Sequence, residues 1–213
     1  MSNIADIRTD YMMADLVEAD ASENAVEQFA KWWKQAESSQ IEEINAMTLC
    51  TVGADLVPQG RIVLLKGFSE KGFEFYTNYD SNKGKELLAF PKASLVFFWK
   101  ELQRQVRITG SVEKLSIEES TAYYHSRPRG SQLGAWASAQ SVVIENRAVL
   151  TDKLADLQNR FASSEVPKPA YWGGYKVVPA TIEFWQGRPS RLHDRLLYTL
   201  SDNNNWKIER LSP

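Results

Sequence analysis

A cation-rich turn near the C-terminus carries the residues best suited to chemistry. It separates two apolar, strand-like runs, and Gly187 and Pro189 mark its position. If the second strand begins at Arg191, period-two alternation places Arg191, His193 and Arg195 on one face. Two guanidiniums beside an imidazole form a cationic surface that suits a flat, anionic ligand. The alternative is a solvated edge strand that binds nothing.

Two further groups of cations in the first half of the chain suit a phosphate. Arg61 and Lys66 lie at the two ends of an apolar strand. They lie on opposite faces if the strand is regular, so one ligand could contact both only along the edge of the strand or around its end. Lys83 follows Tyr76 and Thr77 and lies at the start of a predicted helix, where N–H groups attract anions. Snorkelling strand-end cations and a solvated lysine are the alternatives.

A second possible phosphate clamp surrounds the expected end of a helix near residue 126. It contains Tyr123, Arg127, Arg129 and Ser131, in which two guanidiniums have a hydroxyl on each side. The alternative is an irregular loop whose cations offset the dipole at a helix C-terminus.

The chain lacks the residue patterns of a protein that catalyses without a cofactor. Only His125 and His193 occur, and neither has the context of a Ser/His/Asp triad. No carboxylate pair, zinc-ligand spacing, G-x-G-x-x-G or Walker A sequence stands out. An enzyme with this sequence would supply anion binding and orientation while a cofactor supplies the reactivity. Two separate clamps favour a phosphorylated cofactor and a phosphorylated substrate.

Bulk composition narrows the class of protein. The chain has 213 residues, 43% of them hydrophobic, and a net charge of −2, so no global basic field favours nucleic acid. Cys50 is the only cysteine, which fits a reducing cytosol. No apolar run reaches the roughly 18 residues of a membrane span, and no signal peptide is evident. We therefore expect a soluble, cytoplasmic protein with no membrane partner.

The periodicity of apolar residues predicts an α+β protein built on an antiparallel β-barrel, in one domain over 1–213 with a loose arm over 1–20. Predicted helices cover 22–38 with Ser22 as N-cap, 81–90, 116–126 with a capping box, and 142–161. Predicted strands cover 47–52, 60–66, 72–77, 93–99, 103–115, 180–185, 191–200 and 206–211, with 60–66 and 72–77 forming a hairpin. Pro128 and Gly130 are expected to break the third helix. Gln140 and Ser141 could simply cap the fourth, and Trp185 could simply be core.

Taken together, these residues resemble the pyridoxamine (pyridoxine) 5′-phosphate oxidase family, FMN enzymes that make pyridoxal 5′-phosphate. The similarity runs from Arg8 to Pro213. Its most specific pieces are 61–66 (RIVLLK), 125–136 (HSRPRGSQLGAW), 171–175 (YWGGY), 183–187 (EFWQG) and 191–195 (RLHDR).

The resemblance implies a split β-barrel homodimer with FMN at the subunit interface and a mobile N-terminal arm over 1–20. By matching position it implies that FMN contacts Arg61, Ile62, Val63, Leu64, Leu65, Lys66, Tyr76, Thr77, Asn82, Lys83, Gln105, Gln140, Ser141, Trp185 and Arg195. It implies that the substrate contacts Arg8, Tyr11, Lys66, Tyr123, Arg127, Ser131, Arg191, Leu192 and His193, with Arg191 and His193 as the catalytic pair. Asn82 departs from the family pattern, because many relatives carry Arg there.

The implied reaction moves a hydride from the C4′ carbon of a phosphorylated pyridine to FMN, and dioxygen then takes the electrons to give hydrogen peroxide. The pyridine substrate, dioxygen and a second copy of the chain are therefore the expected partners, and no metal is expected.

Two rival hypotheses remain. A related flavin reductase should lack the Tyr123, Arg127 and Ser131 clamp, and a non-catalytic carrier would not need Arg191 and His193 together.

Overall fold

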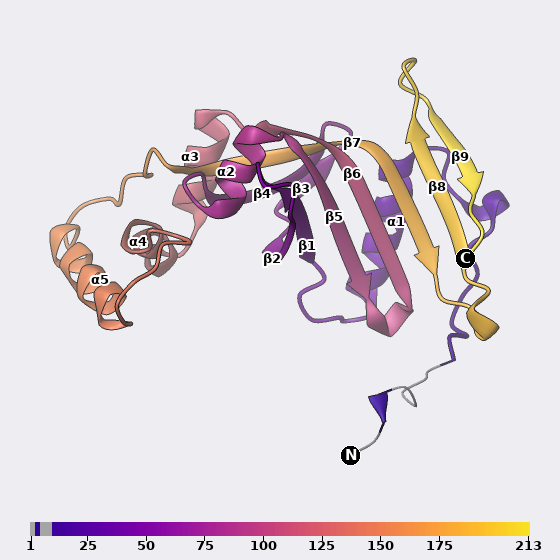
Figure 1. The fold of residues 1–213 in the computed structure, drawn as a ribbon, viewed down its shortest axis with the longest axis horizontal. Helices are drawn as coiled ribbons and strands as arrows, with labels where there is room; N and C mark the ends of the chain where they lie inside the picture. The colour runs from indigo at the N-terminus through magenta and orange to yellow at the C-terminus, as the bar shows by residue number, and fades with distance from the viewer. Residues whose placement is uncertain (1–2, 5–9) are drawn as a thin grey trace.

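The computed structural model describes residues 3–4 and 10–213, which fold into strands and helices (Figure 1). In chain order the described elements are η2 Glu18–Asp20, α1 Ala25–Ser38, β1 Ala46–Val52, β2 Pro58–Leu64, β3 Gly67–Ser69, β4 Gly72–Asn78, α2 Asn82–Ala89, β5 Lys92–Trp99, η3 Lys100–Leu102, β6 Arg104–Lys114, α3 Ile117–Ser126, α4 Arg129–Ala137, α5 Ala148–Arg160, β7 Trp172–Gln186, η4 Pro189–Arg191, β8 Asp194–Leu200 and β9 Trp206–Arg210.

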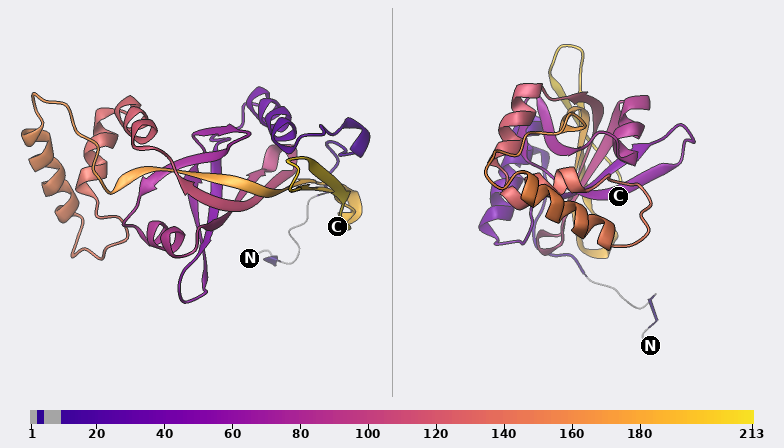
Figure 2. Two further views of the ribbon diagram at one scale, coloured as in Figure 1. Left: turned by 90° about the horizontal axis from the view of Figure 1, so that it is seen from above. Right: turned by 90° about the vertical axis from the view of Figure 1, so that its left-hand side faces the viewer.

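All nine strands among the described residues belong to one antiparallel sheet, so the predicted α+β class is confirmed. The strand order is β2-β1-β5-β6-β7-β4-β3, and β8 and β9 extend from the other half of β7. β7 is the longest strand, with 15 residues; its first half pairs with β4 and its second half with β8. This strand therefore connects the two ends of the molecule (Figures 1 and 2).

Helix α1 buries an aromatic stripe against the sheet. The ring of Phe29 lies 5.0 Å from that of Phe73 and 5.3 Å from that of Phe97, and all three side chains are fully buried. The helix begins later than predicted, because the side chain of Asn24, not Ser22, accepts hydrogen bonds from the first-turn N–H groups.

Helices α3, α4 and α5 form a second hydrophobic cluster beside the sheet (Figure 2). The capping box of α3, made by Ser116 and Glu119, is confirmed. The predicted end of this helix at Ser126, before Pro128, is also confirmed. The sequence did not predict α4, which starts directly afterwards with Pro128 as its N-cap, because helices tolerate proline at their start. α5 begins at Ala148 instead of residue 142. Three β-branched residues, 142–144, precede it and have low helix propensity.

Three strand predictions also need correction, the first being that of β7, which begins at Trp172 instead of residue 180. β2 pairs along its whole length with β1, and the hairpin partner of β4 is the short β3. Gly72 closes that hairpin at φ +130°, where a Cβ would lie 2.4 Å from the carbonyl oxygen of Val177. β8 begins at Asp194, because Ser190 and Arg191 have φ values of 56° and 62° and form the turn η4.

Part of the predicted N-terminal arm lies on the end of the sheet where β7 turns into β8. The backbone N–H groups of Met12 and Leu16 donate to Gln103 Oε1 at 2.9 Å and Asp194 Oδ2 at 3.2 Å. Arg188 forms an ion pair with Asp15. Within the part of the chain that the structure describes, no helix is long and apolar enough to cross a membrane.

Candidate active site

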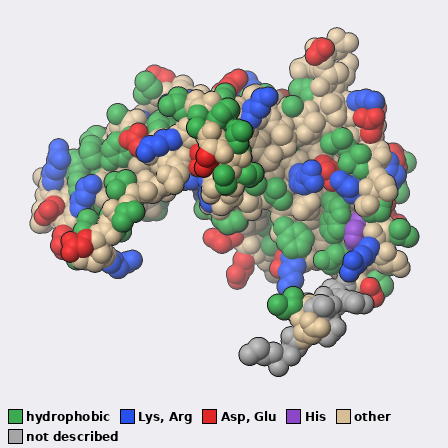
Figure 3. All heavy atoms as spheres, in the orientation of Figure 1, with side chains coloured by type: hydrophobic (Ala, Val, Ile, Leu, Met, Phe, Trp, Pro, Cys, Tyr) green, Lys and Arg blue, Asp and Glu red, His purple; other side chains and the backbone are tan. Residues whose placement is uncertain are grey.

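A cavity of about 800 Å³ lies between the sheet and the helical cluster. The space-filling view shows the surface hollowed between these two parts (Figure 3). β2, β4, α2, α3, α4 and the segments beside them supply its walls. The lining residues are Arg61, Ile62, Val63, Leu64, Lys66, Tyr76, Thr77, Asn78, Lys83, Tyr123, Arg127, Pro128, Ser131, Gly134, Ala135, Ser138, Gln140 and Trp172.

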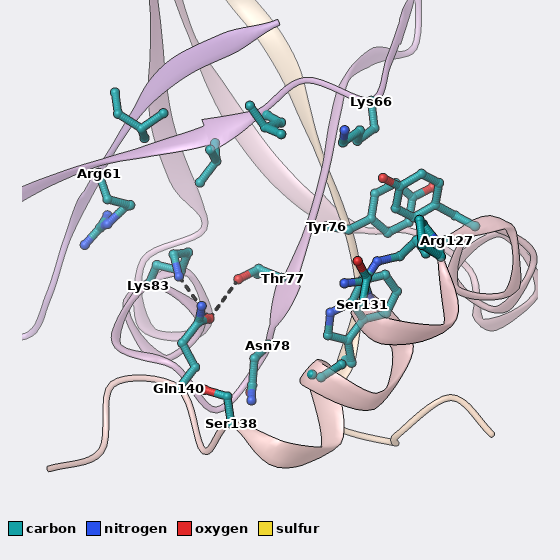
Figure 4. Close-up of a pocket in the computed structure, with 18 residues that line it drawn as sticks. Arg61, Lys66, Tyr76, Thr77, Asn78, Lys83, Arg127, Ser131, Ser138 and Gln140 are labelled. Atoms are coloured by element: carbon teal, nitrogen blue, oxygen red, sulfur yellow. Dashed lines mark hydrogen bonds between the residues drawn. The ribbon is translucent and has the colours of Figure 1, made fainter. Parts of the chain in front are cut away.

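The cavity is electropositive. Its described lining contains four cations, Arg61, Lys66, Lys83 and Arg127, and no carboxylate. Arg61 and Lys66 reach the same cavity because β2 ends at Leu64, so the alternation of a regular strand does not apply to Lys66. In the close-up, Arg61 and Lys83 lie on one side and Lys66 and Arg127 on the other (Figure 4).

The first pair of cations lies at the start of α2. Ser81 caps the helix, and Lys83 in its first turn is only 9% exposed. Lys83 Nζ donates to Gln140 Oε1 at 3.2 Å, which Thr77 Oγ1 also approaches at 3.3 Å (Figure 4). Burial, followed by the charge of Arg61, lowers the pKa of Lys83. An anion here would stabilise the ammonium and meet N–H groups of the helix start.

Arg61 is oriented by a carboxylate outside the cavity lining. Its Nη2 lies 3.0 Å from Glu86 Oε2 on α2, and Thr51 bonds to both side chains. The guanidinium is therefore held at the cavity wall with part of its hydrogen-bonding fork still available.

The second pair of cations includes a guanidinium with an unmet hydrogen-bond requirement. Arg127 Nη1 is buried and has no partner among the described residues. The guanidinium carbon lies 4.6 Å from the ring centroid of Trp172, and burial lowers the pKa of Arg127. Tyr76 and Tyr123 stack with ring centroids 3.9 Å apart in the same wall. Buried donors of this kind require an acceptor, and an anionic group in the cavity would supply it.

The predicted pairing of Arg127 with Arg129 in one clamp is wrong. Arg129 bonds to the backbone carbonyls of Phe161 and Ser164, at the C-terminal end of α5. It satisfies carbonyl groups that the helix leaves free and lies outside the cavity lining.

A second set of predicted site residues lies at the other end of the sheet. The strand register places Gln105, Trp185 and Arg195 side by side on β6, β7 and β8. Arg195 Nε donates to Glu183 Oε1 at 2.9 Å, and Glu183 is almost fully buried. The buried carboxylate thus fixes the direction of Arg195.

His193 belongs to this second set, but the predicted common strand face is wrong. Arg191 lies in η4, before β8 begins, and Leu192 is 70% exposed. The His193 ring lies 4.6 Å from the ring of Trp185 and 5.9 Å from that of Tyr11. The turn gathers these groups without strand alternation. Arg8 lies outside the described residues.

The two sets are too far apart for one small molecule to reach both within a chain. Tyr76 pairs with Gly174 and Gln105 with Trp185, 11 residues further along β7. At about 3.3 Å per residue this separation is roughly 35 Å.

Three predicted residues lie outside both sets. Leu65 is buried in the core. Asn82 is exposed beside the cavity, and its N–H donates to Ser141 Oγ at 3.3 Å. Ser141 does not cap α5, whose N-cap is Arg147. The prediction from sequence also missed lining residues: Asn78, Pro128, Gly134, Ala135, Ser138 and Trp172. Of these, Trp172 lies in the conspicuous aromatic and glycine motif over 171–175, which was the available signal.

Comparisons with known proteins identify the family. A family model described as pyridoxamine 5′-phosphate oxidase matches residues 17–161, and the C-terminal dimerisation region of pyridoxine 5′-phosphate oxidase matches 172–213. Pyridoxine/pyridoxamine 5′-phosphate oxidases from Nostoc sp. and Salinibacter ruber are 53% and 52% identical, over 99% and 100% of this chain and 98% and 100% of their own.

Two solved structures share the fold. PhzG from Burkholderia lata, determined in complex with tetrahydrophenazine-1-carboxylic acid, has a TM-score of 0.87 and 27% identity, covering 95% of this chain and all of its own. A pyridoxamine 5′-phosphate oxidase-related, FMN-binding protein from Nostoc punctiforme has a TM-score of 0.71 at 16% identity, covering 90% of this chain and 99% of its own. With both family models and relatives at about half identity over their full length, this chain belongs to the pyridoxine/pyridoxamine 5′-phosphate oxidase family of oxidoreductases.

Proposed function

We propose that this protein is an FMN-dependent oxidase that converts pyridoxine 5′-phosphate and pyridoxamine 5′-phosphate to pyridoxal 5′-phosphate with dioxygen as acceptor. The observation that carries the proposal is the buried, unpartnered Nη1 of Arg127 in a cavity whose described lining has four cations and no carboxylate. Such a site favours phosphate groups, each of about −1.5 to −2 charge.

The cavity residues fit two phosphates. Lys83, Arg61 and the start of α2 would hold the phosphate of FMN, and Thr77 and Gln140 would add neutral hydrogen-bonding groups. Lys66, Arg127 and Ser131, which lie on the second side of the cavity in Figure 4, would hold the substrate phosphate together with Tyr123 of the same lining. Bound FMN would supply a two-electron acceptor for the substrate carbon and pass the electrons to dioxygen, which leaves as hydrogen peroxide.

The residues at the far end of β7 would complete this site from a second copy of the chain. Trp185, Arg195 and Gln105 would meet the cofactor, and Arg191 and His193 the pyridine ring. Three observations support the arrangement. The C-terminal dimerisation region matches 172–213, and the two sets lie roughly 35 Å apart along β7. Apolar side chains are also exposed, among them Ile62 of the cavity lining by 66% and Val143, three residues after the lining residue Gln140, by 97%.

In this arrangement the protein contributes binding, orientation and exclusion of water. The phosphate clamp fixes one end of the substrate, and Arg191 and His193 hold the ring so that its reacting carbon lies near attack distance. Tyr11, which packs edge-on at 5.8 Å from Trp185, would narrow access to the same position.

The test is an absorption spectrum of the purified protein in air, before and after addition of pyridoxine 5′-phosphate. We expect a flavin spectrum, production of hydrogen peroxide, and accumulation of the aldehyde product. Pyridoxine without phosphate is the matched control and should react far more slowly. A flavin-bound protein that turns over neither compound would refute the oxidase proposal.

A further inference from the structure

The backbone around His193 restricts which of its ring nitrogens can carry a proton. The N–H of Arg188 lies 3.0 Å from His193 Nδ1. A backbone amide can only donate, so Nδ1 must accept and cannot itself be protonated while this bond exists. In the neutral imidazole the single proton therefore lies on Nε2.

The donor of this hydrogen bond is held in place on both sides. The side chain of Arg188 pairs with Asp15 in the N-terminal segment, and its Nε lies 3.6 Å from Asp194 Oδ2 at the start of β8. The preceding Gly187 N–H donates to the carbonyl of Gln103 at 2.8 Å. The Arg188 amide is thus anchored by the N-terminal segment, by β8 and by the residue that precedes β6.

The surroundings of His193 also favour its neutral form. Burial and the charge of Arg191 lower its pKa. Asp194 is the adjacent carboxylate, but Arg210 Nη1 at 2.8 Å, Arg188 and the Leu16 N–H already bind it. Trp185 and Tyr11 pack against the ring without adding charge. Nε2 makes no hydrogen bond within the described part of the chain, so its N–H remains available for a ligand.

We propose that Arg188 is a positioning residue that fixes His193 as a neutral Nε2–H hydrogen-bond donor to the substrate. The identity of the acceptor rests on the proposed function: an oxygen substituent on the pyridine ring is the fitting partner. A nitrogen that already carries a proton cannot take another, so this assignment excludes His193 as the general base.

The direct test is two-bond nitrogen–proton NMR of the holoenzyme labelled with ¹⁵N-histidine, at pH 7 and without substrate. The chain has two histidines, so a His125→Gln variant assigns both signals. His125 faces Glu165 at 3.5 Å and lies outside the cavity lining, which makes it a neutral choice. We expect the Nε2–H tautomer for His193. A signal from the Nδ1–H tautomer, or from the doubly protonated ring, would overturn the proposal.

A second experiment separates positioning from simple packing. Arg188→Ala keeps the backbone amide but removes its side-chain anchors to Asp15 and Asp194, and we expect the NMR signal to shift toward a mixture of tautomers. His193→Gln keeps an N–H donor near the position of Nε2, whereas His193→Asn keeps only an acceptor near Nδ1. The His193→Gln variant should therefore retain a kcat about tenfold higher than the His193→Asn variant, which corresponds to the contribution of about one hydrogen bond.

The NMR outcomes do not depend on the proposed activity, whereas the comparison of kcat applies once that activity is established. Equal kcat for the two His193 variants would overturn the donor role even if the enzyme is an oxidase. An unchanged tautomer in Arg188→Ala would remove Arg188 as the positioning residue. Absence of oxidase activity with the Nε2–H tautomer intact would instead refute the proposed function and leave the assignment of the proton standing.

Discussion

The guanidinium of Arg127 lies 4.6 Å from the ring centroid of Trp172, while its Nη1 is buried without a hydrogen-bond partner in the described chain. The aromatic face stabilises the cation but satisfies none of its N–H groups. The residue is therefore held ready for an acceptor that enters the cavity, and its contribution to binding should depend on the phosphate.

Replacing Arg127 with Met should lower kcat/KM for pyridoxine 5′-phosphate by roughly 10- to 150-fold, the equivalent of about 1.5–3 kcal/mol for a charge-assisted hydrogen bond. The slow turnover of pyridoxine without phosphate should change little. Arg129→Met is the matched control, because Arg129 carries the same charge two residues away but binds carbonyls at the end of α5. Equal losses with both substrates would argue against a phosphate clamp.

Lys83→Met should weaken FMN binding about 10- to 150-fold, for the same reason, when apoprotein is titrated by flavin fluorescence. Lys85→Met, on the exposed side of the same helix, should have almost no effect. Asn82→Arg should raise the affinity for FMN by less than about threefold, because Asn82 is exposed and Arg61 already places a guanidinium in the cavity lining. A large gain that disappears at high salt would mean that α2 presents Asn82 to the phosphate.

Glu183→Gln should destabilise the protein by about 1–3 kcal/mol, because it leaves Arg195, at 2.9 Å, and Arg107, at 3.4 Å, without their shared buried carboxylate. Thermal unfolding at fixed protein concentration measures the loss. Glu113→Gln removes an exposed pair with Lys176 and should cost less than about 1 kcal/mol. If the two variants unfold at the same temperature, the buried network contributes no more than a surface ion pair.

Acid should destabilise the folded protein through His193. Its pKa is lowered in the folded state by burial and by Arg191, so the unfolded chain binds this proton at higher pH. Well above pH 6.5, the pKa of histidine in the unfolded chain, His193 is neutral in both the folded and the unfolded protein. The free energy of unfolding then falls as the pH drops below 6.5, because only the unfolded chain gains the proton. Urea unfolding should show a larger loss between pH 7.5 and 5.5 in wild type than in His193→Gln. A larger loss in the variant would mean that folding raises the pKa of His193, contrary to this prediction.

The sequence was sufficient to predict the elements whose signals are local. The capping box at Ser116, the helix start at Ser81 and the extents of β5 and β6 all fall within one residue of the predicted positions. The fold class followed from them, since strands linked mainly by hairpins require an antiparallel sheet.

What failed depended on tertiary context. Pro128 ends α3 as expected, but the sequence did not predict that it also starts α4, because the second cluster of buried residues is what stabilises a helix directly after it. Similarly, η4 places Arg191 outside β8 because two residues adopt left-handed φ, which no alternation pattern reveals. Arg127 and Arg129 looked equivalent in sequence, yet a helix start between them sends their side chains to different places.

The length of β7 has a genetic consequence. One end of this strand borders the cavity and the other carries Trp185, so each proposed site would use the two ends from different subunits. A subunit inactivated in its cavity and a subunit inactivated in its η4 turn could then rescue one another. Their mixed dimer would contain one doubly damaged site and one intact site. Two null alleles of this kind, expressed together, should restore activity through half of the sites in each mixed dimer.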